Sequence, residues 1–375
     1  MSAAATGWPA RAQARGLSWP WTYKREGTRD LRFDLVRGLC VFGMICNHIG
    51  SNSWARIFSL HDGLLITPAE GFVFISGFIF GMVYSSYIQK NGQLAAVEKA
   101  FKRCLTIYLL SVVLSFVFGG VMYLNGVTDG LGPVTSVPRF ILDIITLHQV
   151  VFMVDVLTMY TFLIALGAFA IWLISRGHTV WVLAPSLALW SAYQVDPEWA
   201  DTIPWPIQHN VMFHIAAWQM PFLVALCLGY HRNVVLAWLH RWQQLLFPGA
   251  TAVMAALVYL TLTQSQHFEW LAGLSQKPAE GPLRLVACLF VFQLAQLLMT
   301  YFWRPIYAAV GWLLMPLGQN SLYAYTMHLL VMAAVWQLTQ AYQDSEPVNT
   351  AVQLGAVLLV WGLTKKRVLF KIIPR

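Results

Sequence analysis

Long uninterrupted apolar blocks are the feature that most constrains the fold of this chain. The plainest is CLTIYLLSVVLSFVFGGVMYL, residues 104–124, which contains no charged residue. A run of about 18 or more apolar residues is long enough to cross a bilayer as a helix. Hydrophobic residues make up 58% of the 375 residues and charged residues only 11%, whereas a soluble domain carries about 25% charged residues. The sequence therefore predicts an all-α integral membrane protein.

Ten apolar segments separated by short polar joints predict a bundle of about ten transmembrane helices. A shorter stretch at 139–148 is typical of a short helix at the membrane interface, ahead of the fourth span. The predicted spans are 33–50, 69–89, 104–124, 149–175, 179–195, 211–230, 244–264, 284–302, 317–338 and 350–364.

The charged residues divide between alternate joints and so predict an orientation. Lys and Arg favour the cytoplasmic side of a membrane, and they gather in both terminal segments and the even-numbered joints, whereas most Asp and Glu lie in the other joints. Both termini are therefore expected in the cytoplasm. We divide the chain into a basic cytoplasmic N-terminal segment (1–32), a membrane domain (33–364) and a basic cytoplasmic tail (365–375). Because the net charge of +8 follows this pattern, no nucleic-acid partner is expected.

Three ionisable residues, Asp34, Arg37 and His48, lie in the first predicted span, where such groups are costly and mark functional sites. At about 100° per residue, Arg37 and His48 differ by about 20° around a helix, and Asp34 lies within about 60° of both. A guanidinium can hold a phosphate or carboxylate, and a neutral imidazole can accept a proton from an attacking hydroxyl. The alternative is an Asp34–Arg37 ion pair that anchors the helix end, with His48 at the opposite interface.

The spacing Arg37-x10-His48 resembles the signature of the acyltransferase-3 membrane proteins. The stretch DLVRGLCVFGMICNHIG, which starts at Asp34, resembles more specifically the OpgC branch of that family. Thr158 stands where this branch usually has proline, so the sequence does not show whether the helix is kinked at this position. Four later segments resemble the same branch in order: GFVFISGFIFG (71–81), DVLTMYTFL (155–163), FHIAAWQMPFLVALCLGY (213–230) and LGQNSLYAYTMHLLV (317–331).

The resemblance implies an acyltransferase of the bacterial inner membrane, surrounded by lipid, with a coenzyme A thioester as donor and a periplasmic glucan as acceptor. It implies that His48 is catalytic and that Arg37 is essential. The OpgC branch succinylates osmoregulated periplasmic glucans, so succinyl-CoA is the expected co-substrate, and an acetyl donor on another envelope glycan is the alternative. A homo-oligomer or a partner in glucan synthesis stays open. A succinyl group would need a cation near His48, and the candidates are Arg56, Arg139 and Arg284.

Further polar residues complete the predicted site. Glu70 joins the catalytic candidates, because at the periplasmic start of the second span it could orient His48 or contact a sugar. Helix–helix contacts are the competing interpretation for Ser76 and Gln219. On the ninth span, residues that share one helical face or lie beside it could line a donor channel: Asn320, Ser321, Tyr325 and His328. The other predicted substrate-binding residues are Asn47, Ser76, Asp155, His214 and Gln219.

Other chemistries lack their motifs. The sequence contains no Walker loop, no HExxH and no CxxC, and its five cysteines lie in apolar blocks, so no metal site is expected. An acyl relay through Cys46 is a minor alternative, and an acyl-imidazole on His48 is the alternative to direct attack by the sugar hydroxyl. Two other classes stay open: a secondary transporter of an acylated sugar, with the buried ionisable residues as coupling groups, and a partner subunit of a polysaccharide synthase.

Overall fold

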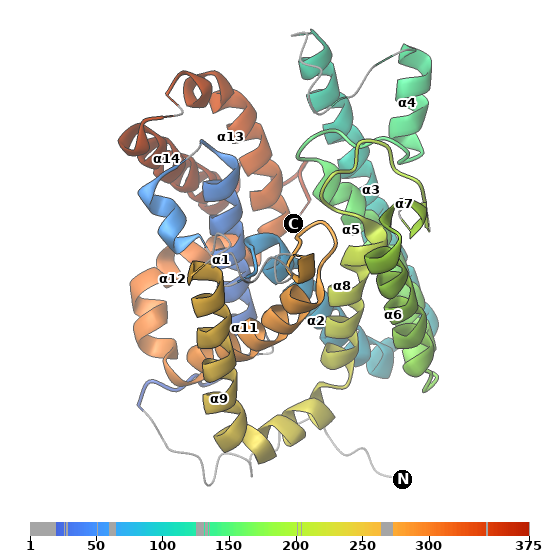
Figure 1. Cartoon of the computed structure of the whole chain (residues 1–375), viewed down its shortest axis with the longest axis vertical. Coiled ribbons are helices and arrows are strands. Elements are labelled where there is room, and N and C mark those ends of the chain that lie inside the picture. The colour runs from blue at the N-terminus through green and yellow to red at the C-terminus, as the bar shows by residue number, and fades with distance from the viewer. Residues whose placement is uncertain are drawn as a thin grey trace.

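The fold is all-helical, as the sequence predicts (Figure 1). Every named element in the described part of the chain is a helix, and its β-pairing is limited to an isolated bridge between Gln149 and Gln208. The computed structural model describes residues 20–374 except 26, 28, 51, 60–64, 125–130, 132–133, 135, 201, 204, 264–272 and 343.

Two groups of helices lie on either side of α2. In Figure 1, α3 to α8 lie on the right, and α1, α9 and α11 to α14 lie on the left. The helices are α1 (Leu31–His48), η2 (Trp54–Phe58), α2 (Pro68–Asn91), α3 (Gln93–Leu124), α4 (Val137–Ile145), α5 (Asp155–Ile174), α6 (Val180–Val195), α7 (Pro197–Ala200), α8 (Ile215–Tyr230), α9 (Arg232–Thr263), α11 (Pro282–Tyr301), α12 (Trp303–Gln319), α13 (Ser321–Ala341) and α14 (Glu346–Lys365).

Five helices of the described chain are long and apolar enough to cross a membrane, namely α2, α3, α5, α11 and α14. Shorter apolar segments lie in α6, α8 and α13. Each of the ten predicted spans overlaps at least one helix, and the two spans not yet matched correspond to α1 and α9. The count of ten crossings nevertheless stays a prediction. Helix α1 is not among the five, since its 18 residues include Arg32, Asp34 and Arg37.

The helix ends differ from the predicted spans. Helices α3 and α9 begin well before their predicted spans and each runs for 32 residues. Helix α12 occupies residues that were predicted mostly as a polar joint, and the predicted span 317–338 is divided at Asn320 between α12 and α13. The short helix predicted at 139–148 corresponds to α4. Hydropathy locates only the apolar part of a helix. The polar turns at its ends keep the same backbone hydrogen bonds and so belong to the helix, but their side chains carry no hydropathy signal.

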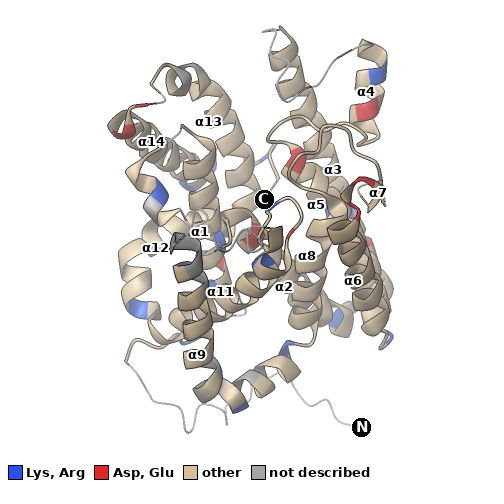
Figure 2. Ribbon diagram, viewed as in Figure 1, with Lys and Arg blue, Asp and Glu red and all other residues tan. Residues whose placement is uncertain are grey.

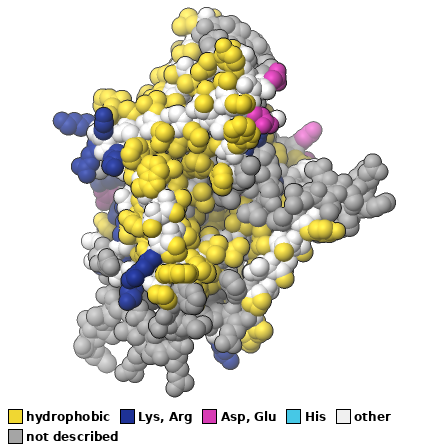
Figure 3. Space-filling view, turned by 90° about the vertical axis from the view of Figure 1, so that its left-hand side faces the viewer, with side chains coloured by type: hydrophobic (Ala, Val, Ile, Leu, Met, Phe, Trp, Pro, Cys, Tyr) yellow, Lys and Arg dark blue, Asp and Glu magenta, His cyan; other side chains and the backbone are white. Residues whose placement is uncertain are grey.

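The outer surface is largely apolar. Figure 3 shows hydrophobic side chains over much of the face that Figure 1 has on its left, and Figure 2 shows charged residues mostly at helix ends and in loops. On α3, an exposed apolar stripe repeats every fourth residue: Leu105, Leu109, Val113, Val117 and Val121. Soluble monomers rarely expose apolar patches of more than a few hundred Å². The apolar outer surface therefore supports the assignment as a membrane protein.

Glycines bring pairs of helices into backbone contact. A Cβ atom at Gly77 or Gly81 of α2 would meet the carbonyl group of Phe222 or Leu226 in α8, so the spacing Gly77-x-x-x-Gly81 allows the two helices to pack closely. Gly318 of α12 lies in the same way against the backbone of Asp34 in α1. These contacts fix α1 and α2 against the rest of the bundle.

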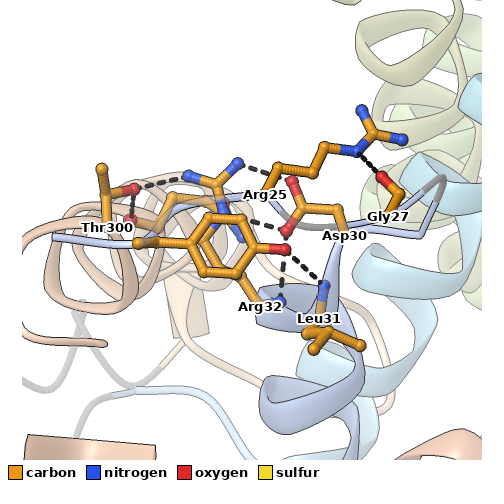
Figure 4. Close-up of polar contacts among 8 residues, drawn as sticks. Arg25, Gly27, Asp30, Leu31, Arg32 and Thr300 are labelled. Atoms are coloured by element: carbon orange, nitrogen blue, oxygen red, sulfur yellow. Dashed lines mark hydrogen bonds and ion pairs between the residues drawn. The ribbon is translucent and has the colours of Figure 1, made fainter. Parts of the chain in front are cut away.

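A polar network fixes the start of α1 (Figure 4). Asp30 accepts from Nε and Nη2 of Arg32 at 2.9 and 2.6 Å, and Arg32 Nη1 donates to the hydroxyl of Thr300 in α11 at 2.6 Å. The Leu31 amide donates to the Tyr23 hydroxyl at 3.1 Å. Because α1 is one continuous helix, this anchoring sets the position of the polar residues further along it.

The contact at Gly81 predicts that Gly81→Ala destabilises the protein. The added methyl group would meet the backbone of Leu226 and Tyr230, neither of which can turn aside as a side chain can, at a cost of about 1–3 kcal/mol. Thermal unfolding in detergent should show a lower Tm. The control is Gly120→Ala in α3, where the added Cβ would meet nothing within 4 Å. An equal Tm for the two variants would contradict this account of the α2–α8 contact.

Candidate functional site

Two histidines from different helices form a hydrogen-bonded pair. Nδ1 of His48, the last residue of α1, lies 3.0 Å from Nε2 of His328 in α13. Nδ1 of His328 lies 2.5 Å from the carbonyl oxygen of Tyr325, so it must carry a proton. In a neutral His328, Nε2 then accepts the proton of His48 Nδ1, which leaves Nε2 of His48 unprotonated. This is the tautomer that a general base requires.

A cavity of about 470 Å³ lies between α1, α2, α3, α5 and α13. Nε of Arg37 is buried and has no hydrogen-bond partner within the described chain. The guanidinium group therefore keeps a donor for a ligand. Four predicted site residues line this cavity: Arg37, Ser76, Ser321 and Tyr325.

Three further cations line the same cavity, all of them from α3: Lys99, Lys102 and Arg103. Lys99 lies over the ring of Tyr87, 4.1 Å from its centroid, and Lys102 pairs with Glu98 at 2.6 Å. Most of the other lining residues are apolar, including Phe80, Ile107, Leu157 and Ile164. The cavity thus suits an elongated molecule with anionic groups at one end. The sequence pattern assigned these lysines and this arginine only to membrane orientation, because nothing in it shows which face of α3 turns inward.

Tyr325 connects the cavity to the histidine pair. Its side chain lines the cavity, its hydroxyl donates to the carbonyl oxygen of Met153 at 2.9 Å, and its ring lies edge-on to His328 at 4.8 Å between centroids. Neither His48 nor His328 is among the residues that line the cavity. Arg37 and His48 therefore occupy two neighbouring environments that meet at Tyr325, rather than one shared polar face.

Lys277 interacts electrostatically with His48, and Asp155 with Tyr325. Asp155 is the first residue of α5, and its Oδ1 accepts from the amide of Val156 at 2.8 Å. None of the ion pairs of the described residues includes Asp155. Lys277, in the loop between α9 and α11, interacts electrostatically with both His48 and Asp155. Neither hydropathy nor helical spacing predicts a role for Lys277, because both describe residues within helices and Lys277 lies in a loop.

The predicted Asp34–Arg37 ion pair is not formed. Both carboxylate oxygens of Asp34 instead contact Arg29, at 2.7 Å each, while Arg37 turns to the cavity. Arg29 precedes α1, so its backbone can place the guanidinium against the carboxylate without helical constraint. Asp34 therefore fixes the segment before the helix.

Glu70 is fully buried and pairs with Arg284 rather than with His48. Its Oε1 accepts from Nη2 and Nε of Arg284 at 2.6 and 2.9 Å, and its Oε2 accepts from the amide of Thr67 at 2.9 Å. The side chain thereby caps α2 and joins it to α11. Glu280 is buried close by, and burial together with the Glu70 carboxylate raises the pKa of Glu280 well above its usual value.

Two further predicted residues, Gln219 and His214, lie in contacts on the α8 side of the bundle. The amide of Gln219 accepts from the Ser186 hydroxyl at 2.6 Å and donates to the Ser186 carbonyl at 2.9 Å, so it joins α8 to α6. His214 precedes α8, and its ring centroid lies 5.2 Å from that of Tyr193. The contact of Gln219 is the helix–helix alternative that the sequence left open.

Asn47 and Asn320 occupy structural positions near the two ends of the site. Oδ1 of Asn47 accepts from the Ser59 hydroxyl at 2.8 Å and so holds the end of η2 against α1. Asn320 separates α12 from α13 and donates to the Pro316 carbonyl at 3.0 Å.

Within the described residues there is no group of three or more His, Cys, Asp or Glu side chains that could hold a metal ion.

Comparison with known proteins matches one family model, described as OpgC protein, over residues 29–371. This range contains every helix from α1 to α14. No curated protein matches the chain, and no solved structure matches it.

The raised pKa of Glu280 predicts a pH-dependent stability. Because the carboxyl group holds its proton to higher pH in the folded state than in the unfolded state, the wild type loses stability as pH rises above the unfolded pKa. Glu280→Gln keeps the shape and cannot ionise, so its Tm should exceed that of the wild type at pH 8, with the difference shrinking towards pH 5. Glu98→Gln on α3 serves as the control. A Glu280→Gln variant that loses the same stability at both pH values would contradict the assignment.

Proposed function

The chain belongs to the OpgC family, which implies a glucan-modifying acyltransferase, and from this premise we propose that it transfers a succinyl group from succinyl-CoA to a hydroxyl of a periplasmic glucan. The observation that supports this best is the cation-lined cavity that reaches Tyr325, next to the hydrogen-bonded pair of His48 and His328. The proposal places the protein in a bacterial inner membrane with both termini in the cytoplasm.

The cavity matches the chemistry of a coenzyme A thioester. The donor carries phosphate groups at one end, for which Lys99, Lys102 and Arg103 supply positive charge, and a long uncharged arm that suits the apolar lining. A volume of about 470 Å³ lies in the range of small-molecule sites, roughly 300–1,000 Å³. Arg37, with its unpaired Nε, is placed to hold an oxygen of the donor deeper in the cavity.

Transfer requires one proton to move at His48. In the proposed reaction, Nε2 of His48 takes the proton of a glucose hydroxyl while the oxygen attacks the thioester carbonyl carbon. The tetrahedral intermediate expels the coenzyme A thiolate, and the imidazolium returns the proton to the sulfur. The products are a succinyl ester and free coenzyme A. Attack by His48 itself, through an acyl-imidazole, is the alternative.

His328 acts as a positioning residue in this scheme. Its Nδ1 is committed to the Tyr325 carbonyl, so its Nε2 selects the His48 tautomer in which Nδ1 carries the proton. The hydrogen bond also stabilises the imidazolium that forms during transfer. This arrangement resembles the role of the orienting group behind a general base in other acyl-transfer enzymes.

Lys277 is the proposed specificity residue for succinyl over acetyl. A succinyl group carries a free carboxylate that an acetyl group lacks, so its pocket needs a cation close to the reacting carbonyl. Lys277 interacts electrostatically with His48 from the loop before α11. Asp155 also interacts electrostatically with Lys277.

The central prediction concerns His48 and is tested in proteoliposomes with succinyl-CoA and glucan. His48→Gln should lower ester formation by about 100-fold or more, the usual contribution of general acid–base catalysis. His328→Gln should reduce it by at least about tenfold, since a lost hydrogen bond of about 1.4 kcal/mol corresponds to that factor. His178→Gln, an exposed histidine after α5, should leave the rate unchanged.

Two results would contradict this proposal. Unchanged ester formation in His48→Gln would remove the general base. Movement of glucan across the membrane without release of coenzyme A would indicate a transporter instead.

A second prediction concerns the acyl group. Lys277→Ala should raise KM for succinyl-CoA by about tenfold or more, because a charge-assisted contact of about 1.5–3 kcal/mol is lost, and should change acetyl-CoA kinetics little. Arg139→Ala on α4, which removes an exposed cation elsewhere in the chain, is the control. An equal rise in KM for succinyl-CoA and acetyl-CoA, or an unchanged KM for succinyl-CoA, would show that Lys277 does not recognise the carboxylate.

A further inference from the structure

A second cavity, of about 520 Å³, lies where α12 gives way to α13. It shares no lining residue with the donor cavity, although the neighbouring residues Asn320 and Ser321 line one cavity each. Its wall is formed by the segment before α1, the α12–α13 junction, the end of α14 and the C-terminal segment that follows. The first turn of α13 therefore separates two distinct spaces.

The second cavity is lined by cations and by uncharged polar groups. Arg29 comes from the segment before α1, whereas Lys365 and Arg367 come from the end of α14 and the residues after it, and no carboxylate is among the described lining residues. Arg29 is paired with Asp34, whereas none of the ion pairs of the described residues includes Lys365 or Arg367. Lys365 lies over the ring of Trp361, 4.8 Å from its centroid. Two of the three cations therefore line the cavity without a carboxylate partner among the described residues.

The backbone after α14 is shaped to bring Arg367 to this place. The Tyr323 hydroxyl of α13 donates to the Val368 carbonyl at 2.6 Å, and the ring of Phe370 lies edge-on to Tyr323 at 4.5 Å between centroids. Arg367 and Leu369 adopt the left-handed region, with φ of 56° and 59°, which non-glycine residues rarely occupy. A strained backbone of this kind persists where its surroundings determine it, and such positions cluster at ligand sites.

Uncharged polar groups complete the lining of this cavity. Thr364 lies in the last turn of α14. Asn320, between α12 and α13, makes no side-chain capping bond to α13. Asn320 and the exposed Gln319 also contribute amide groups to the lining.

We propose that this second cavity binds a phosphate-bearing group, held by Lys365, Arg367 and Arg29. A phosphate oxygen set accepts hydrogen bonds from lysine, arginine and amide donors at once, and its charge of up to about −2 matches the unpaired cations. The group could belong to an anionic phospholipid headgroup or to a soluble phosphate compound. This site does not depend on the proposed acyl transfer, because it stands outside the donor cavity and the histidine pair.

A pair of double variants tests the site in the full-length protein. Lys365→Ala with Arg367→Ala removes two lining cations, and Lys366→Ala with Lys371→Ala removes two charges from the same segment that do not line the cavity. Binding of pyrophosphate is measured by calorimetry in detergent, and retention of phosphatidylglycerol by native mass spectrometry. At least one probe should bind the wild type and the Lys366→Ala, Lys371→Ala variant with equal affinity. The same probe should bind the Lys365→Ala, Arg367→Ala variant about tenfold or more weakly, as expected for a lost contact of about 1.4 kcal/mol.

The two probes separate the sources of the phosphate. Retention of phosphatidylglycerol alone supports a lipid headgroup, and binding of pyrophosphate alone supports a soluble compound. Failure of both probes to bind the wild type, or equal weakening in both double variants, would overturn the site. If the first double variant fails to fold, the single change Lys365→Gln at the exposed end of α14 takes its place with the same expected direction.

Discussion

The hydrogen bond between His48 and His328 is the interaction on which the rest of the site depends. It joins the last turn of α1 to the middle of α13, and it can form only if both helices are held at the right height. The network of Asp30, Arg32 and Thr300 fixes one end of α1, and the contact at Gly318 fixes its side against α12. The position of His48, the proposed general base at the end of α1, thus depends on contacts made some distance along the helix.

The charged groups inside the bundle sort into two kinds. Asp34 and Glu70 form ion pairs with Arg29 and Arg284, so they join segments of the chain. Arg37 keeps an unpaired donor, and it lies in the cavity that ends at Tyr325. Since burying a charge without a partner is costly, this difference separates structural ion pairs from candidates for ligand contact better than burial alone.

Hydropathy predicted the helical membrane fold, because it is a local property, and short motifs predicted the family. The predicted site residues that line the cavity are Arg37, Ser76, Ser321 and Tyr325. The face of α13 that carries Ser321, Tyr325 and His328 follows from spacing alone. Partners across the bundle could not be predicted: spacing suggested Asp34 with Arg37, but a residue outside the helix reaches Asp34 instead. Lys277 and the inward face of α3 depend on tertiary packing, which a single sequence does not specify.

The most direct measurement of the central claim is a sided transfer assay. Proteoliposomes of uniform orientation would hold labelled succinyl-CoA on the side proposed for both chain termini and unlabelled glucan only on the other side. A donor cavity that meets the histidine pair predicts succinylated glucan on the far side, with one free coenzyme A released on the donor side for each ester formed. The account would be contradicted if esters formed only when both substrates were on the same side of the membrane. It would also be contradicted if the glucan stayed unmodified while the donor was present.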